Sequence, residues 1–192
     1  MNMRIVLPAA FALAACGSQP AAEPPLAGAS IGGPFSLIDG NGRPFTDRNL
    51  AGRWRIMYFG YTFCPDVCPV DMQNIGAGLR IFEKQHPRLA AKVVPVFVTV
   101  DPERDTPAVV KEYVSAFHPR GVGLTGTAEA VDQAADAYRV PYAKRPPAPG
   151  GGYMVDHGRS AYLMDPDGKP VALLSADRNP EAVAAELRRW VT

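Results

Sequence analysis

Short segments rich in apolar residues recur along the chain after residue 30 and predict strands. Most are bounded by Gly, Pro, Asn or Asp residues, which favour turns. The segments lie at 35–38, 43–45, 55–60, 93–100, 121–124, 160–164 and 170–174. The segment at 93–100 is nearly continuous in apolar residues, as is typical of a central parallel strand, although Pro95 removes one backbone donor from it. The first two and the last two segments each predict a hairpin, because a Gly-containing turn separates them.

Between these segments, apolar residues recur at three- and four-residue spacing and predict helices. One helix begins near Pro69, another covers about residues 127–138, and Thr106-Pro107 and Asn179-Pro180 mark the starts of two more. Their apolar stripes are Met72, Ile75, Leu79 and Phe82 in the first, Val109, Val110, Tyr113, Val114 and Phe117 after Thr106, and Val183, Leu187, Trp190 and Val191 after Asn179. Residues 141–152 carry four Pro and three Gly, so we expect a loop there.

The order of these elements predicts an α/β fold. Strands alternate with helices and the series closes with a hairpin and a last helix, which mixes parallel crossovers with antiparallel pairing. This order resembles a thioredoxin-like fold: a central mixed sheet with flanking helices, here with an added N-terminal hairpin. In such a fold, the turn between the first core strand and its helix is the reactive corner.

Composition and charge exclude several classes of protein. The chain has 192 residues, of which 47% are hydrophobic, which suits one domain with a packed core. Lys and Arg number 20 against 19 Asp and Glu. A balance so close to neutral excludes a polybasic nucleic-acid binder and a charge-rich disordered tail. The 3 Cys are too few for a disulfide framework, and their odd number requires an explanation.

The N-terminus has the features of a secretory signal. Arg4 precedes an apolar run at 5–15 that is too short to span a bilayer, which needs about 20 apolar residues. The ending Leu13-Ala14-Ala15-Cys16 resembles a bacterial lipobox, in which a diacylglycerol is attached to the cysteine thiol. The alternative is an ordinary signal peptide with an incidental Cys16. We therefore expect a signal peptide at 1–15, a flexible lipid tether at 16–30, and one domain at 31–192.

Cys64 and Cys68 occupy the predicted reactive corner. Residues four apart in a helical turn share a face, with Cα atoms roughly 6 Å apart, so the two sulfurs can close a disulfide or hold a metal ion. Pro65 and Pro69 place Cys68 near the start of the helix, where the helix dipole favours a thiolate. The alternative is a structural disulfide, although a loop this short would stabilise the fold little.

Of the three histidines, His157 stands in the most suggestive context. His86 and His118 each precede a proline at a predicted helix end and fit surface or C-cap positions. His157 follows the Pro- and Gly-rich loop and precedes the terminal hairpin, so a thioredoxin-like sheet would bring it beside the cysteines. Two thiolates and one imidazole suit Cu(I) in trigonal geometry, while zinc prefers a fourth ligand. Asp66 or Asp156 could orient the imidazole. An ordinary loop histidine is the alternative.

Three motifs in this order resemble the Sco/SenC family. They are Tyr61–Pro69, Val100–Pro107, and Val155–His157 followed by Tyr162–Gly168, and the resemblance covers about residues 30–192. It implies a membrane-tethered, thioredoxin-fold copper chaperone that serves the copper A centre of cytochrome c oxidase subunit II. It also implies that Cys64, Cys68 and His157 are the copper ligands. Family members often use a transmembrane anchor, whereas this chain is expected to use a lipid on Cys16.

The resemblance and the residues together predict a function and its rivals. We expect a non-enzymatic protein on the periplasmic side of a bacterial membrane that binds Cu(I), Cu(II) or both. Its partners would be the oxidase subunit and a periplasmic thiol reductant or copper donor, because oxidation to a Cys64–Cys68 disulfide would destroy the site. The alternatives are a thiol-disulfide oxidoreductase acting on the oxidase subunit's cysteines and a redox sensor.

Overall fold

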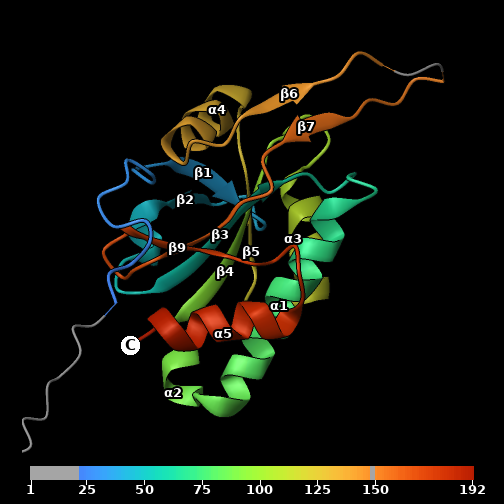
Figure 1. Cartoon of the computed structure of the whole chain (residues 1–192). Helices are drawn as coiled ribbons and strands as arrows, with labels where there is room; N and C mark the ends of the chain where they lie inside the picture. Colours follow the sequence, from blue (N-terminus) through green and yellow to red (C-terminus); the bar gives the residue numbers. More distant parts are fainter. Residues whose placement is uncertain (1–21, 148–149) are drawn as a thin grey trace, which may run out of the picture.

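A mixed sheet forms the centre of the molecule in the computed structural model, which describes residues 22–147 and 150–192 (Figure 1). Its strand order is β2-β1-β5-β4-β3-β8-β9. The strands are β1 (Ser36–Asp39), β2 (Pro44–Thr46), β3 (Trp54–Gly60), β4 (Val93–Thr99), β5 (Val122–Thr125), β8 (Ala161–Met164) and β9 (Pro170–Leu174). Strands β3, β4 and β5 are parallel, and the remaining pairs are antiparallel. The expected mixed sheet, its central β4 and both hairpins are therefore confirmed.

Helices cover both faces of this sheet (Figure 1). They are α1 (Val67–Gln85), α2 (Pro87–Ala90), α3 (Pro107–Phe117), α4 (Ala128–Ala137) and α5 (Pro180–Trp190), with a 3-10 turn η1 (Asp47–Leu50). Adjacent residues of β3 face opposite layers, since Tyr58 bonds to Asp71 of α1 and the Phe59 ring packs 5.2 Å from the ring of Tyr138, which follows α4. All seven residues of β3 are buried, as expected for a strand covered on both sides.

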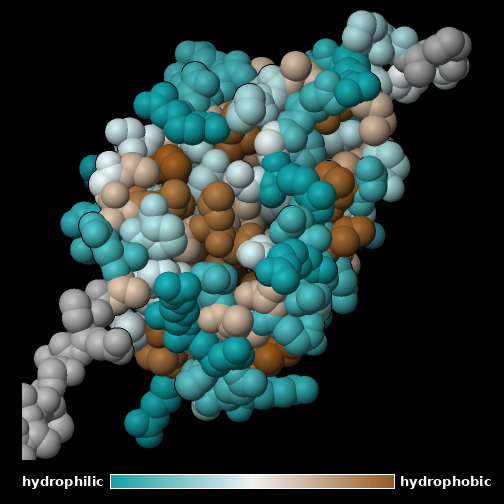
Figure 2. Space-filling view, viewed as in Figure 1, coloured by the Kyte–Doolittle hydropathy of each residue, from teal (hydrophilic) through white to brown (hydrophobic). Residues whose placement is uncertain are grey.

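Helix α1 packs closely between α3 and α5. A Cβ added at Gly78 would lie 2.6 Å from Val183 of α5, and one at Gly76 would collide with Phe117 of α3. The predicted helix starts are confirmed by their caps: the Thr106 and Asn179 side chains accept hydrogen bonds from backbone N–H groups in the first turns of α3 and α5. Figure 2 shows mainly hydrophilic residues over α4 and α5 and a group of apolar ones over the middle of this face, in front of β9 and β3.

The expected loop at 141–152 contains a strand, and this part of the prediction was wrong. Strand β6 (Tyr142–Lys144) pairs with β7 (Val155–His157) in an antiparallel ribbon that is separate from the main sheet and projects from it (Figure 1). The register places Tyr142 opposite His157. The ribbon therefore fixes the segment that carries the candidate histidine.

Two expectations concern the N-terminus. The signal peptide at 1–15 and Cys16 lie outside the described residues. Of the expected tether at 16–30, the described part forms a turn in which the N–H of Leu26 donates to the carbonyl of Val171 and the Leu26 side chain packs on the core. Within the part of the chain that the structure describes, no helix has the length and apolar character needed to cross a membrane.

Candidate metal centre

The pairing of β8 with β3 brings distant residues to one corner of the sheet. Strand β8 runs antiparallel to β3, with Ala161 opposite Tyr58. The segment that leads into β8 therefore lies beside the turn that leaves β3. Cys64 lies in that turn, Cys68 in the first turn of α1, and His157 at the end of β7. The predicted approach of His157 to the cysteine corner is confirmed by this geometry.

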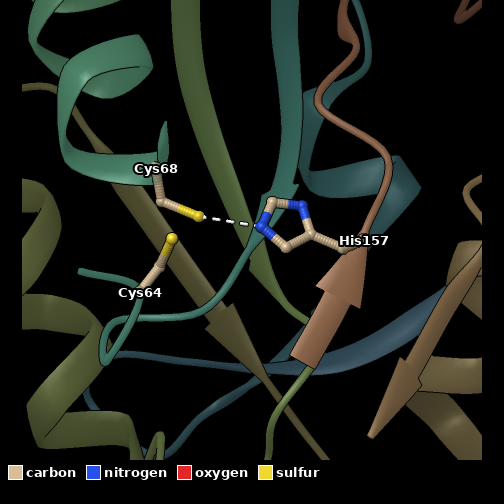
Figure 3. Close-up of side chains that lie close together, drawn as sticks. All are labelled: Cys64, Cys68 and His157. Carbon is tan, nitrogen blue, oxygen red and sulfur yellow. Dashed lines mark hydrogen bonds between the residues drawn. The ribbon is translucent and has the colours of Figure 1, made fainter. Parts of the chain in front are cut away.

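The side chains of Cys64, Cys68 and His157 converge on one small space (Figure 3). Their ligand atoms all lie within 4.8 Å of one another, and Cys68 Sγ is 3.1 Å from His157 Nε2. Both cysteines are free thiols. An ion bound at about 2.0–2.3 Å by three ligands in a plane needs its donors roughly 3.5–4 Å apart, so small adjustments would let this cluster hold one.

The His157 ring is oriented by the backbone. Its Nδ1 lies 2.8 Å from the carbonyl oxygen of Gly158, and a hydrogen on Nδ1 that donates there leaves the Nε2 lone pair facing the sulfurs. The exposed Asp156 carboxylate instead pairs with Arg145 at 2.7 Å. Within residues 22–147 and 150–192, neither Asp66 nor Asp156 hydrogen-bonds to the imidazole. The orienting role expected of a carboxylate thus falls to the Gly158 carbonyl.

Burial dominates the chemistry of the Cys68 thiol. Its side chain is 0% exposed, against 9% for Cys64. Burial raises the pKa of Cys68 well above its usual value and outweighs a hydrogen bond with the Tyr61 backbone, which acts in the opposite direction. The thiolate expected from the helix N-terminus is therefore not what the structure favours for the metal-free protein.

A buried carboxylate fixes the turn before Cys64. Asp105 accepts hydrogen bonds from the Thr62 backbone N–H at 2.9 Å, from the Thr62 hydroxyl at 2.6 Å and from the Thr99 hydroxyl at 2.6 Å. Burial raises the pKa of Asp105, and the bonds from Thr62 and Thr99 oppose that rise. The turn is thereby tied to the end of β4. Asp105 belongs to the second motif of the family resemblance, but no pattern in the sequence predicts this contact.

An arginine joins the same turn to the segment that carries His157. The Arg104 guanidinium carbon lies 3.7 Å above the centre of the Tyr153 ring and 4.9 Å from that of Phe63. Its Nε donates to Asp101 at 2.5 Å, and its Nη1 donates to the Tyr153 carbonyl at 3.1 Å. Phe63 precedes Cys64, so Arg104 contacts both sides of the metal centre.

A second arginine connects the opposite side. Arg159, two residues after His157, donates twice to Asp71 of α1, at 2.7 and 3.1 Å. The Asp71 carboxylate is fully buried and also accepts from the Tyr58 hydroxyl at 2.9 Å. Because Asp71 lies one helical turn after Cys68, this ion pair links the helix that carries one ligand to the segment that carries another.

Comparison with known proteins shows that this chain is similar to one family over most of its length. The SCO1/SenC family model matches residues 23–192. "Protein SCO1 homolog 1, mitochondrial" of Arabidopsis thaliana is 43% identical over 173 residues, which cover 88% of this chain and 51% of that protein. The chain spans about half the length of the curated relatives it matches.

Solved structures agree with this result. The copper-bound ScoI of Bradyrhizobium japonicum has a TM-score of 0.74 and 44% identity, over 83% of this chain and 99% of that one. A SCO1/SenC family lipoprotein of Bacillus anthracis has a TM-score of 0.70 and 25% identity, over 84% and 95% of the two chains. The predicted thioredoxin-like architecture and the resemblance that rested on three motifs are both confirmed.

Proposed function

The chain belongs to the SCO1/SenC family, and from that premise we propose that it is a copper chaperone. In this proposal it binds copper through Cys64, Cys68 and His157 and delivers it to the copper A site of cytochrome c oxidase subunit II. The observation that carries the proposal is the convergence of the three ligand atoms within 4.8 Å. Two of these atoms, Cys68 Sγ and His157 Nε2, come from residues that are 89 positions apart in the sequence.

The chemistry of the donor set supports copper as the cargo. Two sulfurs and one imidazole nitrogen are soft ligands, and three of them suit Cu(I) in trigonal geometry, whereas zinc prefers four. The copper-bound relative from Bradyrhizobium japonicum has a closely similar fold. Burial raises the pKa of Cys68, and a thiol must lose its proton to bind a metal, so we expect copper affinity to rise with pH.

Delivery requires that the ligands exchange without releasing a free ion. In this proposal, cysteines of the oxidase subunit replace the ligands of this chain one at a time. A periplasmic thiol reductant keeps Cys64 and Cys68 reduced, because a disulfide between them removes two of the three ligands. The assembly of the oxidase is the process that this exchange serves.

We further propose a lipid anchor on the periplasmic side of a bacterial membrane. Residues 1–15 would be the signal peptide and Cys16 would carry the lipid. Residues 16–30 would link that lipid to the domain at 31–192, with Leu26 already packed on the core. The lipobox-like ending at Cys16 and the similar lipoprotein of Bacillus anthracis support this. Cells grown with labelled palmitate should label the wild-type chain but not Cys16→Ser. Equal labelling of both would refute the anchor.

The metal site is tested by His157→Ala, with His86→Ala as the matched control at an exposed helix end. We expect His157→Ala to weaken Cu(II) binding severely while its circular dichroism and unfolding free energy stay close to wild type. His86→Ala should bind as the wild type does. An unchanged copper stoichiometry and optical spectrum in His157→Ala would refute the ligand assignment.

The oxidoreductase alternative is less consistent with the geometry. An exchange catalyst needs an accessible thiolate, whereas Cys64 and Cys68 are both buried and burial raises the pKa of Cys68. A deletion strain distinguishes the two functions, since added copper should rescue oxidase activity if delivery is what it has lost. Disulfide reduction by His157→Ala at the wild-type rate, with no rescue by copper, would favour the oxidoreductase.

A further inference from the structure

One methionine near the metal centre is exposed at the surface, whereas long apolar side chains are usually buried. The Met154 side chain is 43% exposed, whereas Met57, Met72 and Met164 are buried in the core. It lies three residues before His157, just outside the β6–β7 ribbon. The Arg145 N–H donates to the Met154 carbonyl at 2.8 Å and so fixes its backbone. A long apolar side chain is thus held at the surface beside the candidate ligands.

The sulfur of Met154 has a specific partner. The Tyr61 hydroxyl donates to Met154 Sδ at 3.7 Å, and the Tyr61 side chain is only 1% exposed. Hydrogen bonds to thioether sulfur are weak, so this contact contributes little to stability. Its effect is positional, since it keeps the sulfur at the boundary between solvent and the buried phenol.

Tyr61 also borders the metal centre itself. Its ring stands edge-on to the His157 imidazole, with 5.7 Å between the ring centres. Its carbonyl accepts a hydrogen bond from the Cys64 N–H at 3.2 Å. Tyr61 therefore contacts both the Met154 thioether and two of the proposed ligand residues, Cys64 and His157.

We propose that the Met154 thioether is a further Cu(I) ligand, one that holds the ion at the entrance to the Cys64–Cys68–His157 site as it enters and leaves. This inference rests on the proposed function and adds a residue to it. A thioether is a soft ligand for Cu(I), and it carries no proton that must be lost before it binds. The unbranched side chain has three rotatable bonds, which lets the sulfur follow the ion.

The transfer balances without a redox step. Copper remains Cu(I) throughout. Its bond to the Met154 sulfur breaks as a bond to a cysteine sulfur forms, and the proton of that thiol passes to water. Release reverses the sequence. Met154 should therefore change the rates of uptake and release by a similar factor and leave the equilibrium affinity nearly unchanged.

The test compares Met154→Leu with Met164→Leu in the full chain. Leu has about the volume of Met, and such exchanges are well tolerated. Met164 is buried opposite Arg55, at the far end of β3 from the metal centre. For Met154→Leu we expect Cu(I) uptake, and release to bicinchoninate, to slow about tenfold, equivalent to about 1.4 kcal/mol at the barrier. Met164→Leu should exchange copper at the wild-type rate.

A second measurement detects the ligand directly. In Cys64→Ser/Cys68→Ser, labelled with ¹³C at the methionine methyl groups, added Cu(I) should shift the Met154 resonance and leave those of the buried methionines unchanged. The Met154 resonance is assigned by its loss in Met154→Leu. Wild-type exchange rates in Met154→Leu, or a Met154 methyl that does not respond, would overturn this inference alone. A wild-type chain that binds no Cu(I) would overturn the proposed function as well.

Discussion

Replacing Gly60 with Ala should disturb the metal centre through a single sulfur atom. Gly60 ends β3, and a Cβ added there would lie 2.7 Å from Cys68 Sγ. It would also lie 3.1 Å from the Tyr58 ring and 3.3 Å from the Phe97 ring, so two core aromatics limit how the backbone can yield. Non-bonded carbon contacts are favourable at about 3.5–4.0 Å, which means that the sulfur must retreat by roughly 1 Å.

That displacement is large for a metal ligand. Metal–ligand distances in a competent site hold to within about 0.2 Å, and changes in residues that position ligands typically cost about 10–100-fold in affinity. Crowding a packed core costs about 1–3 kcal/mol. We therefore expect Gly60→Ala to lose at least about tenfold in Cu(I) affinity, with an unfolding free energy lower by about 1–3 kcal/mol.

The control makes the same substitution where there is space. A Cβ at Gly152 meets nothing within 4 Å, so Gly152→Ala should match the wild type in both measurements. Affinity is measured by competition with a Cu(I) chelator under reducing conditions, and stability by urea unfolding of the metal-free chain. If Gly60→Ala loses stability but keeps full copper affinity, the close packing of the Cys68 sulfur against Gly60 does not set the position of that sulfur, and the reasoning fails.

Three further substitutions test the surroundings of the site. Arg159→Gln leaves the buried Asp71 with one hydrogen-bond partner, so urea unfolding should show a loss of about 1–2 kcal/mol, and chelator competition a weaker copper site. Arg104→Gln removes the contact over Tyr153, and hydrogen exchange of residues 150–157 should accelerate while that of β3 and β4 does not. Burial lowers the pKa of His118, so the unfolded chain takes up this proton first as pH falls below about 6.5. Stability should then fall by at most about 1.4 kcal/mol per pH unit, and His118→Asn should lose less between pH 7.5 and 5.5; equal losses would refute this assignment.

The core of the fold could be predicted because the spacing of apolar residues in each segment matches the faces on which that segment is buried. Both faces of β3 and β4 are covered by helices, so their residues are uniformly apolar, and α1 shows the spacing of a helix with one buried side. For His118, the same reasoning predicts the position in the chain but not the burial of the side chain. Its place at the end of α3 was predicted, but its burial against Glu83, 3.3 Å away, depends on a helix that is distant in sequence.

The β6–β7 ribbon could not be predicted from local sequence. Tyr142-Ala143-Lys144 is a three-residue strand next to a Pro- and Gly-rich stretch, and its formation depends on pairing with Val155–His157. Local propensity is too weak to specify a strand this short, so the pairing partner decides. The prediction of a loop failed for this reason.

The convergence of the three proposed ligands could be predicted, whereas the residues that position them could not. Cys64, Cys68 and His157 carry chemistry in their own side chains, and β8 pairing with β3 brings them together. Gly60 and Asp105 act only through contacts that form in the folded chain. The helix-dipole argument for a Cys68 thiolate failed for a related reason, since the dipole is visible in the sequence and the burial that outweighs it is not.

The different supports of the three ligands also suggest the order in which they exchange. Cys68 is fixed by α1, and the turn that carries Cys64 is fixed by Asp105, so both belong to the rigid core. His157 ends a three-residue strand in a ribbon that is not part of the main sheet. Moving that ribbon costs the burial of Val155 and the contact between Arg104 and Tyr153, whereas moving either cysteine disturbs β3 or α1 at the centre of the fold. In the proposed delivery, an incoming ligand from the partner would therefore meet least resistance at His157, and the two sulfurs would hold the ion until that bond is replaced.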